Sequence, residues 1–143
     1  MSLKLQFTLP DIHREPQDHQ TLGNLVGHSD VLAIAEACQQ FNGLSVVVTP
    51  DTRTALRLEK SLAQFTQESV QLFPDWETLP YDNFSPHQDI ISARLSALFQ
   101  LQQGNKQIFL LPINTLLQKL CPPSYLSNNV LLIKKGDRFS IEK

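Results

Sequence analysis

The sequence is poor in several features that would point at once to a class of protein. Its two cysteines, Cys38 and Cys121, are too few and too far apart for a disulfide framework. No run of eighteen uncharged apolar residues occurs, and no apolar stretch follows a basic start, so we expect a cytoplasmic protein without a membrane partner. The 12 Lys and Arg residues do not exceed the 14 Asp and Glu residues, which disfavours tight, autonomous binding to nucleic acid.

The motifs of common catalytic centres are missing as well. The chain has no G-x-S-x-G elbow and no C-x-x-C pair, so hydrolase and thiol-redox chemistry lack their usual signatures. Its four histidines are scattered and show no H-E-x-x-H spacing, so no metal site is indicated. We therefore expect no catalytic residue and no metal ligand in this chain.

The sequence does contain an alternation of helical and strand patterns. Apolar residues recur at helical spacing in four segments, which predict helices over 29–41, 55–65, 86–103 and 114–119. Continuous apolar runs predict strands over 44–48, 70–73, 108–111 and 130–133. The first of these strands is expected to be buried on both faces. Strands separated by helices of this length require crossover connections, so the fold class is α/β, with three layers and a mostly parallel sheet that carries helices on both faces.

The start of the helix predicted over 86–103 has the clearest local signal. Ser85 can cap it, Pro86 suits the first helical position, and Gln88 completes a capping box at the third. At the other end, Gly104 favours termination because glycine adopts the left-handed conformation that closes helices.

One stretch stands where a nucleotide-binding sheet would carry its phosphate loop. A working loop reads G-x-x-x-x-G-K-[ST], with a lysine that neutralises the phosphates and a hydroxyl that holds Mg²⁺. The tripeptide Gly-Lys-Ser/Thr occurs nowhere in the chain. At the corresponding positions the sequence has Gly23, Gly27, His28, Ser29 and Asp30. A carboxylate here would repel a triphosphate but suits a helix N-terminus, so capping is favoured over residual anion binding and the nucleotide site is predicted to be degenerate.

The most informative segment is the long loop predicted between the strand at 70–73 and the next helix. It is rich in carboxylates, aromatic residues and prolines. A catalytic interpretation would pair Asp75 or Glu77 with His87 as acid and base. The alternative is an ordered loop held by aromatic packing, and large aromatic side chains favour such packing over the docking of a partner.

Residues 75–95 of this segment closely resemble a signature of the bacterial transcription-repair coupling factors, D-W-E-T-L-P-Y-D-x-F-S-P-H-x-D-I-I-S-x-R-L. The residues that carry it, with a structural or docking role, are Asp75, Trp76, Glu77, Tyr81, Asp82, Phe84, Ser85, Pro86, His87, Asp89 and Arg94. The flanking segments 46–58 and 111–122 agree as well, so the resemblance covers roughly residues 20–138.

The resemblance implies a domain organisation. The chain would be the first subdomain of a module similar to the excision-repair protein UvrB, with a RecA-like fold of P-loop NTPase type. Residues 1–20 are expected to form a polar arm, 21–135 the subdomain that resembles UvrB domain 1a, and 136–143 the start of a following subdomain. Phe84 leads directly into Ser85, which leaves no room for the aromatic hairpin with which UvrB probes damaged DNA.

The resemblance also implies a function in transcription-coupled nucleotide excision repair. In that family the N-terminal module has lost its nucleotide-binding residues, so this chain would need no cofactor. ATP and Mg²⁺ would belong to later motor domains, which drive translocation on DNA and contact RNA polymerase. UvrA would be recruited by the adjacent subdomain, and the present one would pack against other domains of its own chain.

Two alternative functions remain open at this stage. One is a cryptic nucleotide-binding enzyme in which Arg53 or Arg94 supplies the missing cation. The other is a direct DNA-binding module, which the charge balance already disfavours.

Overall fold

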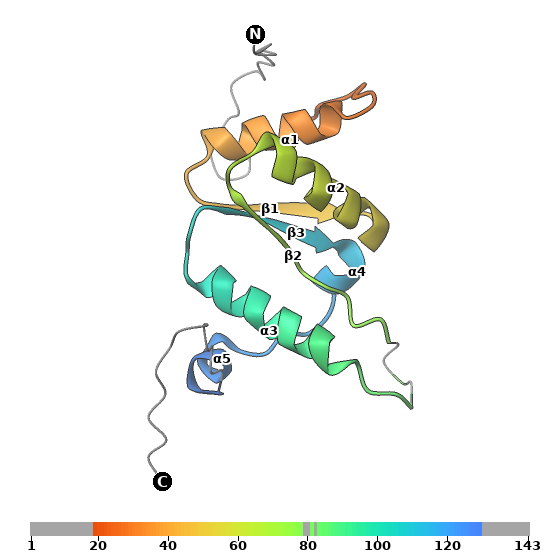
Figure 1. Ribbon diagram of the computed structural model, residues 1–143, viewed down its shortest axis with the longest axis vertical. Helices are drawn as coiled ribbons and strands as arrows, with labels where there is room; N and C mark the ends of the chain where they lie inside the picture. Colours follow the sequence, from red (N-terminus) through yellow and green to blue (C-terminus); the bar gives the residue numbers. More distant parts are fainter. Residues whose placement is uncertain (1–18, 79–80, 82, 130–143) are drawn as a thin grey trace.

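The computed structural model (Figure 1) describes residues 19–78, 81 and 83–129. Its elements follow in the order α1 (Ser29–Gln40), β1 (Leu44–Thr49), α2 (Thr52–Phe65), β2 (Ser69–Leu72), α3 (Gln88–Gln102), β3 (Gln107–Pro112), α4 (Ile113–Leu116) and α5 (Pro123–Asn129). The strand predicted over 130–133, the expected next subdomain at 136–143 and nearly all of the expected arm at 1–20 lie outside the described residues.

The described residues form a sheet of three strands in the order β1-β3-β2, and both of its pairings are parallel. Leu44 pairs with Gln107 at one end of the β1–β3 ladder and Thr49 with Pro112 at the other. The central strand β3 is the most apolar and the most buried, because it has a neighbour on each side and helices on both faces. The predicted parallel sheet is confirmed.

Side chains of β3 alternate between two separate cores, which gives the molecule its three layers. Ile108 and Leu110 point to the face covered by α1 and α2, where Val31, Leu58 and Leu62 complete the cluster. The other face is covered by α3 and α5, as Figure 1 shows. There the buried cluster comprises Phe73, Ala97, Leu98, Phe109 and Leu126. The predicted placement of helices on both faces is confirmed, and the arrangement fits a RecA-like subdomain.

The prediction that the strand at 44–48 is buried on both faces is wrong. Val46 and Val48 are 51% and 49% exposed, whereas Val47 packs against the core of α1 and α2. The reason is the strand order, because β1 lies at the edge of the sheet that the described residues form. An apolar cavity of about 240 Å³, lined among others by Leu44, Val46 and Leu116, opens beside it.

Two helix predictions also need correction. Helix α3 begins at Gln88, with His87 as its N-cap, and therefore starts two residues later than the Ser85 capping box predicted. His87 has extended backbone angles, φ −61° and ψ 140°, and its ring Nδ1 accepts the N–H of Asp89 in place of a serine cap. The seven-residue α5 was not predicted, since it buries a single apolar side chain, Leu126, and so shows no periodicity.

In the part of the chain that the structure describes, no helix is both long enough and apolar enough to cross a membrane.

Candidate functional site

The loop before α1 is the position at which the sequence analysis predicted a degenerate phosphate loop. Residues 19–26 form no strand, and the turn into the helix is made by Gly27 at φ 68°, a left-handed conformation that suits glycine. The hydroxyl of Ser29 donates to the carbonyl oxygen of Val26 at 2.8 Å, and the amide N–H of Ser29 is directed at the same oxygen. The Ser29 hydroxyl and amide are therefore used within the loop itself.

Asp30 occupies the first turn of α1 and is bound from two sides. Its Oδ1 accepts the backbone N–H of Val31 at 2.8 Å, and its Oδ2 lies 2.5 Å from Nη2 of Arg57 on α2. The expectation that Ser29 or Asp30 serves the helix N-terminus therefore holds for Asp30, although the N-cap residue itself is His28 and makes no side-chain cap.

The electrostatics of this pair bear on phosphate binding. The hydrogen bond from Arg57 lowers the pKa of the Asp30 carboxyl below its ordinary value, and the Val31 N–H adds to that effect. Asp30 therefore carries a full negative charge at neutral pH, at the end of the helix where a phosphate would otherwise be stabilised. Among the described residues, the cation in contact with Asp30 is Arg57, whose charge is already neutralised by this carboxylate.

A second cluster joins the β2–α3 loop to helix α3 through Arg94. This side chain is only 2% exposed, and its guanidinium lies between two aromatic rings, 4.3 Å from the centroid of Phe73 and 4.1 Å from that of Trp76. Nη1 donates to the carbonyl oxygen of Pro74 at 2.6 Å. Burial lowers the pKa of Arg94, and the nearby carboxylate of Asp75 opposes that shift. One arginine thus fixes the first residues of the loop.

Asp75 connects the same loop to the segment after β3. Its Oδ1 accepts the backbone N–H of Trp76 and Nε2 of Gln118, both at 2.8 Å, and its Oδ2 accepts Nδ2 of Asn114. Two polar atoms of this cluster, Nη2 of Arg94 and Oε1 of Gln118, are buried without a protein partner. Buried polar groups of this kind are commonly satisfied by an internal water molecule.

Beyond this anchored base, most of the described residues of the loop are exposed to solvent. Glu77 adopts φ 58°, a left-handed conformation that costs a non-glycine residue about 1–2 kcal/mol. Tyr81 and Phe84 are 103% and 81% exposed, so the expectation that loop aromatics pack holds for Trp76 and fails for these two. The His87 ring is exposed and lies 3.3 Å from a carboxylate oxygen of Asp89.

The signature residues therefore fall into two groups. Asp75, Trp76 and Arg94 are brought together at the base, whereas Glu77, Tyr81, Phe84, Ser85, Pro86, His87 and Asp89 lie along the loop or at the start of α3; Asp82 is not among the described residues. The acid–base interpretation gains nothing from this geometry, because Asp75 is hydrogen-bonded to amides while His87 contacts Asp89.

The sequence did not identify the residues that contact Arg94 and Asp75 at the start of the β2–α3 loop. These residues are Phe73, Asn114 and Gln118. An available signal was the charged Arg94 at a helix position flanked by apolar residues, since a buried cation needs aromatic or carbonyl partners nearby. A second available signal was the four-residue spacing of Asn114 and Gln118, which is typical of two side chains on the same face of a helical segment. Among the described residues, no group of three or more His, Cys, Asp or Glu side chains is placed to hold a metal ion.

Comparison with known proteins identifies relatives over nearly the whole chain. A transcription-repair-coupling factor from Haemophilus influenzae is 61% identical over 141 residues, which is 99% of this chain. Another, from Escherichia coli, is 43% identical over 98% of the chain, and one from Rickettsia typhi is 29% identical over 78%. No family model matches the sequence.

The chain spans only 12% of the length of the first two of these relatives. The identity is nevertheless high and almost unbroken across that part. The predicted resemblance is confirmed: the chain belongs to the family of transcription-repair-coupling factors and corresponds to a small N-terminal part of them.

Proposed function

We propose that this chain is a non-catalytic module of a factor that acts in transcription-coupled nucleotide excision repair. The family relationship supports this role, because the chain is 61% identical to a transcription-repair-coupling factor over almost all of its length. The complete polypeptide would be an ATP-dependent DNA translocase that displaces stalled RNA polymerase and recruits UvrA. Its ATP, Mg²⁺, DNA and polymerase sites would lie outside this chain.

The observation that carries the non-catalytic assignment is the ion pair between Asp30 and Arg57. It places a carboxylate and its counter-ion at the α1 N-terminus, where a RecA-like domain of P-loop NTPase type would bind phosphate. The phosphates of a nucleotide would have to approach that carboxylate, and no lysine of a phosphate loop would be there to neutralise the charge of the phosphates.

The alternative in which an arginine replaces the missing lysine is weakened for Arg94. This residue lies on α3, across the sheet from α1, and its guanidinium is enclosed by Phe73 and Trp76. Arg53, in the first turn of α2, is exposed and remains the candidate for that alternative.

A melting experiment with Mg-ATP tests the proposal. A ligand at a hundred times its Kd stabilises the folded state by about 2.7 kcal/mol, which corresponds to roughly 5–11 °C in a domain of this size. We expect millimolar Mg-ATP to leave the melting temperature and the Trp76 fluorescence unchanged. A saturable rise that disappears in Arg53→Ala, or on changing residues 27–30, would refute the proposal, and so would measurable turnover.

Recruitment of UvrA is assigned to the adjacent subdomain, with this chain as its support. The test compares UvrA binding by residues 1–143 with binding by a polypeptide extended through the next subdomain. We expect binding only with the extended form. Equal binding by both would move the UvrA site onto this chain, and a gel shift with duplex DNA at low salt would favour the DNA-binding alternative instead.

A further inference from the structure

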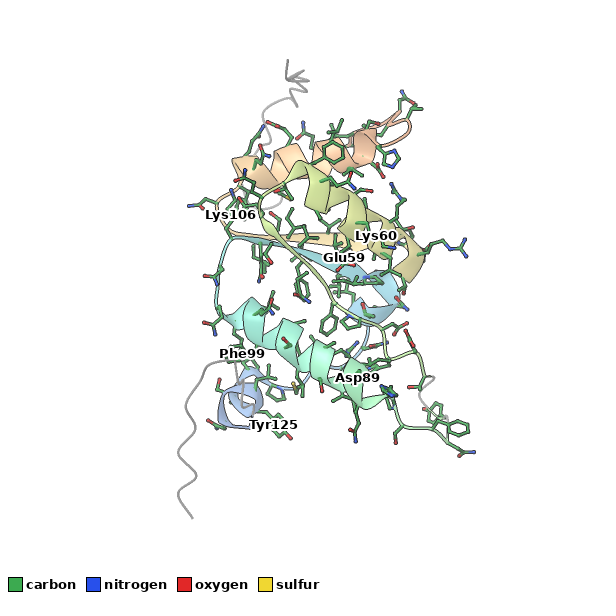
Figure 2. The ribbon with its side chains drawn as sticks, in the orientation of Figure 1. Glu59, Lys60, Asp89, Phe99, Lys106 and Tyr125 are labelled. Carbon is green, nitrogen blue, oxygen red and sulfur yellow. The ribbon has the colours of Figure 1, made fainter. Side chains whose placement is uncertain are left out.

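The connection between α1 and β1 is short and has fixed ends. It consists of residues 41–43, which form neither helix nor strand. On one side, Nζ of Lys106 donates to the carbonyl oxygen of Gln39 in the last turn of α1 at 3.3 Å, and Figure 2 shows Lys106 near that end of the helix. On the other side, Leu44 begins β1 and pairs with Gln107. A change in the length of the connection therefore has to be absorbed within three residues or has to move an element.

This connection contains Asn42 and Gly43, which form the one Asn-Gly pair in the sequence. Asn42 is exposed, and no hydrogen bond joins its side chain to another described residue. Its amide is thus free to rotate toward the backbone nitrogen of Gly43. Glycine shields its own nitrogen least, because it has no Cβ and populates a wide range of backbone angles. The pair therefore combines a free side-chain amide with an accessible backbone nitrogen.

Packing favours glycine at position 43. A Cβ at this position would lie 2.8 Å from Cε1 of the Phe41 ring, well inside the roughly 3.5–4.0 Å optimum for packed carbon atoms. Gly43 is not among the glycines with a positive φ, so the contact with Phe41 and not the backbone conformation is what favours glycine. A residue with a side chain, which would shield Asn42, fits only if the Phe41 ring moves.

We propose that Asn42 is a site of spontaneous covalent modification, at which the side-chain amide is converted to a carboxylate through a cyclic imide. The nitrogen of Gly43 forms a bond to Cγ of Asn42, the Cγ–Nδ2 bond breaks, and ammonia leaves with the proton of the Gly43 N–H. Ring closure is favoured because the reacting atoms belong to adjacent residues. Water then opens the ring at either carbonyl, which yields aspartate or isoaspartate.

The net change is the addition of one water molecule and the loss of one ammonia. The reaction needs only the chain and solvent water, so it is independent of the proposed function.

The modification alters both the length and the charge of the connection. Isoaspartate routes the backbone through the former side chain and so adds one carbon–carbon bond, about 1.5 Å, between α1 and β1. The new carboxylate is ionised at neutral pH, and it lies just beyond the C-terminus of α1, where the helix dipole disfavours negative charge. We therefore expect the isoaspartate form to melt at a lower temperature than the unmodified chain.

Incubation of the chain at mildly alkaline pH, followed by peptide mapping with mass spectrometry, tests the proposal. The matched controls are Asn24 and Asn105, which are also exposed and outside helices and strands but are followed by Leu25 and Lys106. We expect Asn42 to lose its amide at least roughly tenfold faster than either control. Both aspartate and isoaspartate should appear at position 42, and each should contain one labelled oxygen when the solvent is water enriched in heavy oxygen.

A pair of variants tests the role of Gly43 without the steric conflict. Phe41→Ala removes the ring that a Cβ at position 43 would meet, and the ring is 46% exposed, so the chain should tolerate its loss. Phe41→Ala/Gly43→Ala then adds that Cβ. Circular dichroism checks that both variants are folded. We expect the double variant to be modified at least roughly tenfold more slowly than the single variant.

Asn42→Gln tests the consequence for stability, because its longer side chain cannot close the same five-membered ring. The melting temperature of the parent chain should fall during incubation in step with the isoaspartate content, whereas that of Asn42→Gln should stay constant.

Several outcomes would overturn the proposal. They are a rate at Asn42 no greater than at Asn24 and Asn105, aspartate as the sole product, which would indicate direct hydrolysis, and equal rates in the two alanine variants.

Discussion

Replacement of Arg94 by methionine measures how much the buried guanidinium stabilises the domain. The change removes a charge-assisted hydrogen bond to the Pro74 carbonyl, which contributes about 1.5–3 kcal/mol, and two cation–π contacts of about 1 kcal/mol each. It also removes the cost of burying a charge, which offsets roughly 2 kcal/mol of that loss. Methionine keeps most of the stem between the Phe73 and Trp76 rings and adds sulfur–aromatic contacts. We expect a net loss of about 2 kcal/mol.

Urea unfolding followed by the fluorescence of Trp76, the only tryptophan, and by circular dichroism gives the free energy of unfolding. The matched control is Arg53→Met, which should change that free energy by less than about 0.5 kcal/mol because Arg53 is exposed. Lysine at position 94 should recover only part of the loss, since it cannot stack between two rings. If the Arg94→Met variant is as stable as the parent, the free-energy cost of burying the guanidinium charge equals the stabilisation from its contacts. That result would refute the reasoning.

Three further predictions concern other parts of the molecule. The Asp30–Arg57 pair is partly exposed, so Arg57→Ala should lower the free energy of unfolding by less than about 1 kcal/mol. Because folding lowers the pKa of Asp30, this loss of stability should be complete above the ordinary pKa of 3.8 and should shrink as the pH falls further. Urea titrations at several pH values will check both expectations. Leu110→Ala at the centre of β3 should cost about 2–5 kcal/mol by urea unfolding, whereas Leu117→Ala, at a position 81% exposed, should cost less than about 0.5 kcal/mol. Phe84→Ser should leave the melting temperature of the isolated chain almost unchanged, and a large fall would show that Phe84 packs in this domain.

The helices and strands with strong periodicity could be predicted from the sequence. Helix α2 is an example, because Ala55, Leu58 and Leu62 form one buried stripe and Asp51 caps the helix by accepting the N–H of Thr54. Burial of the strand at 44–48 could not be predicted, because an apolar run does not reveal whether a strand lies at the centre or the edge of a sheet. That depends on strand order, which is a property of the whole chain.

The sequence predicted which segment of the chain contains the candidate site, but not which of its residues are in contact in three dimensions. The sequence identified Asp75, Trp76 and Arg94 as members of one signature. It did not reveal that Asp75 contacts Asn114 and Gln118, which lie 39 and 43 residues further along the chain, or that Arg94 contacts the Pro74 carbonyl 20 residues before it. Contacts over such separations depend on tertiary packing. The same limit applies to Asp30, whose partner Arg57 lies 27 residues along the chain on another helix.

The order β1-β3-β2 has a consequence for synthesis of the protein on the ribosome. Among the described strands, both outer ones pair with β3 alone, and its last residue, Pro112, is translated 63 residues after the end of β1 at Thr49. At about 5–20 residues per second, β1 therefore waits roughly 3–13 s for its partner. During that interval its three consecutive valines have no strand to pair with, so the nascent chain is most exposed to aggregation, and most in need of chaperones, before residue 112 leaves the exit tunnel.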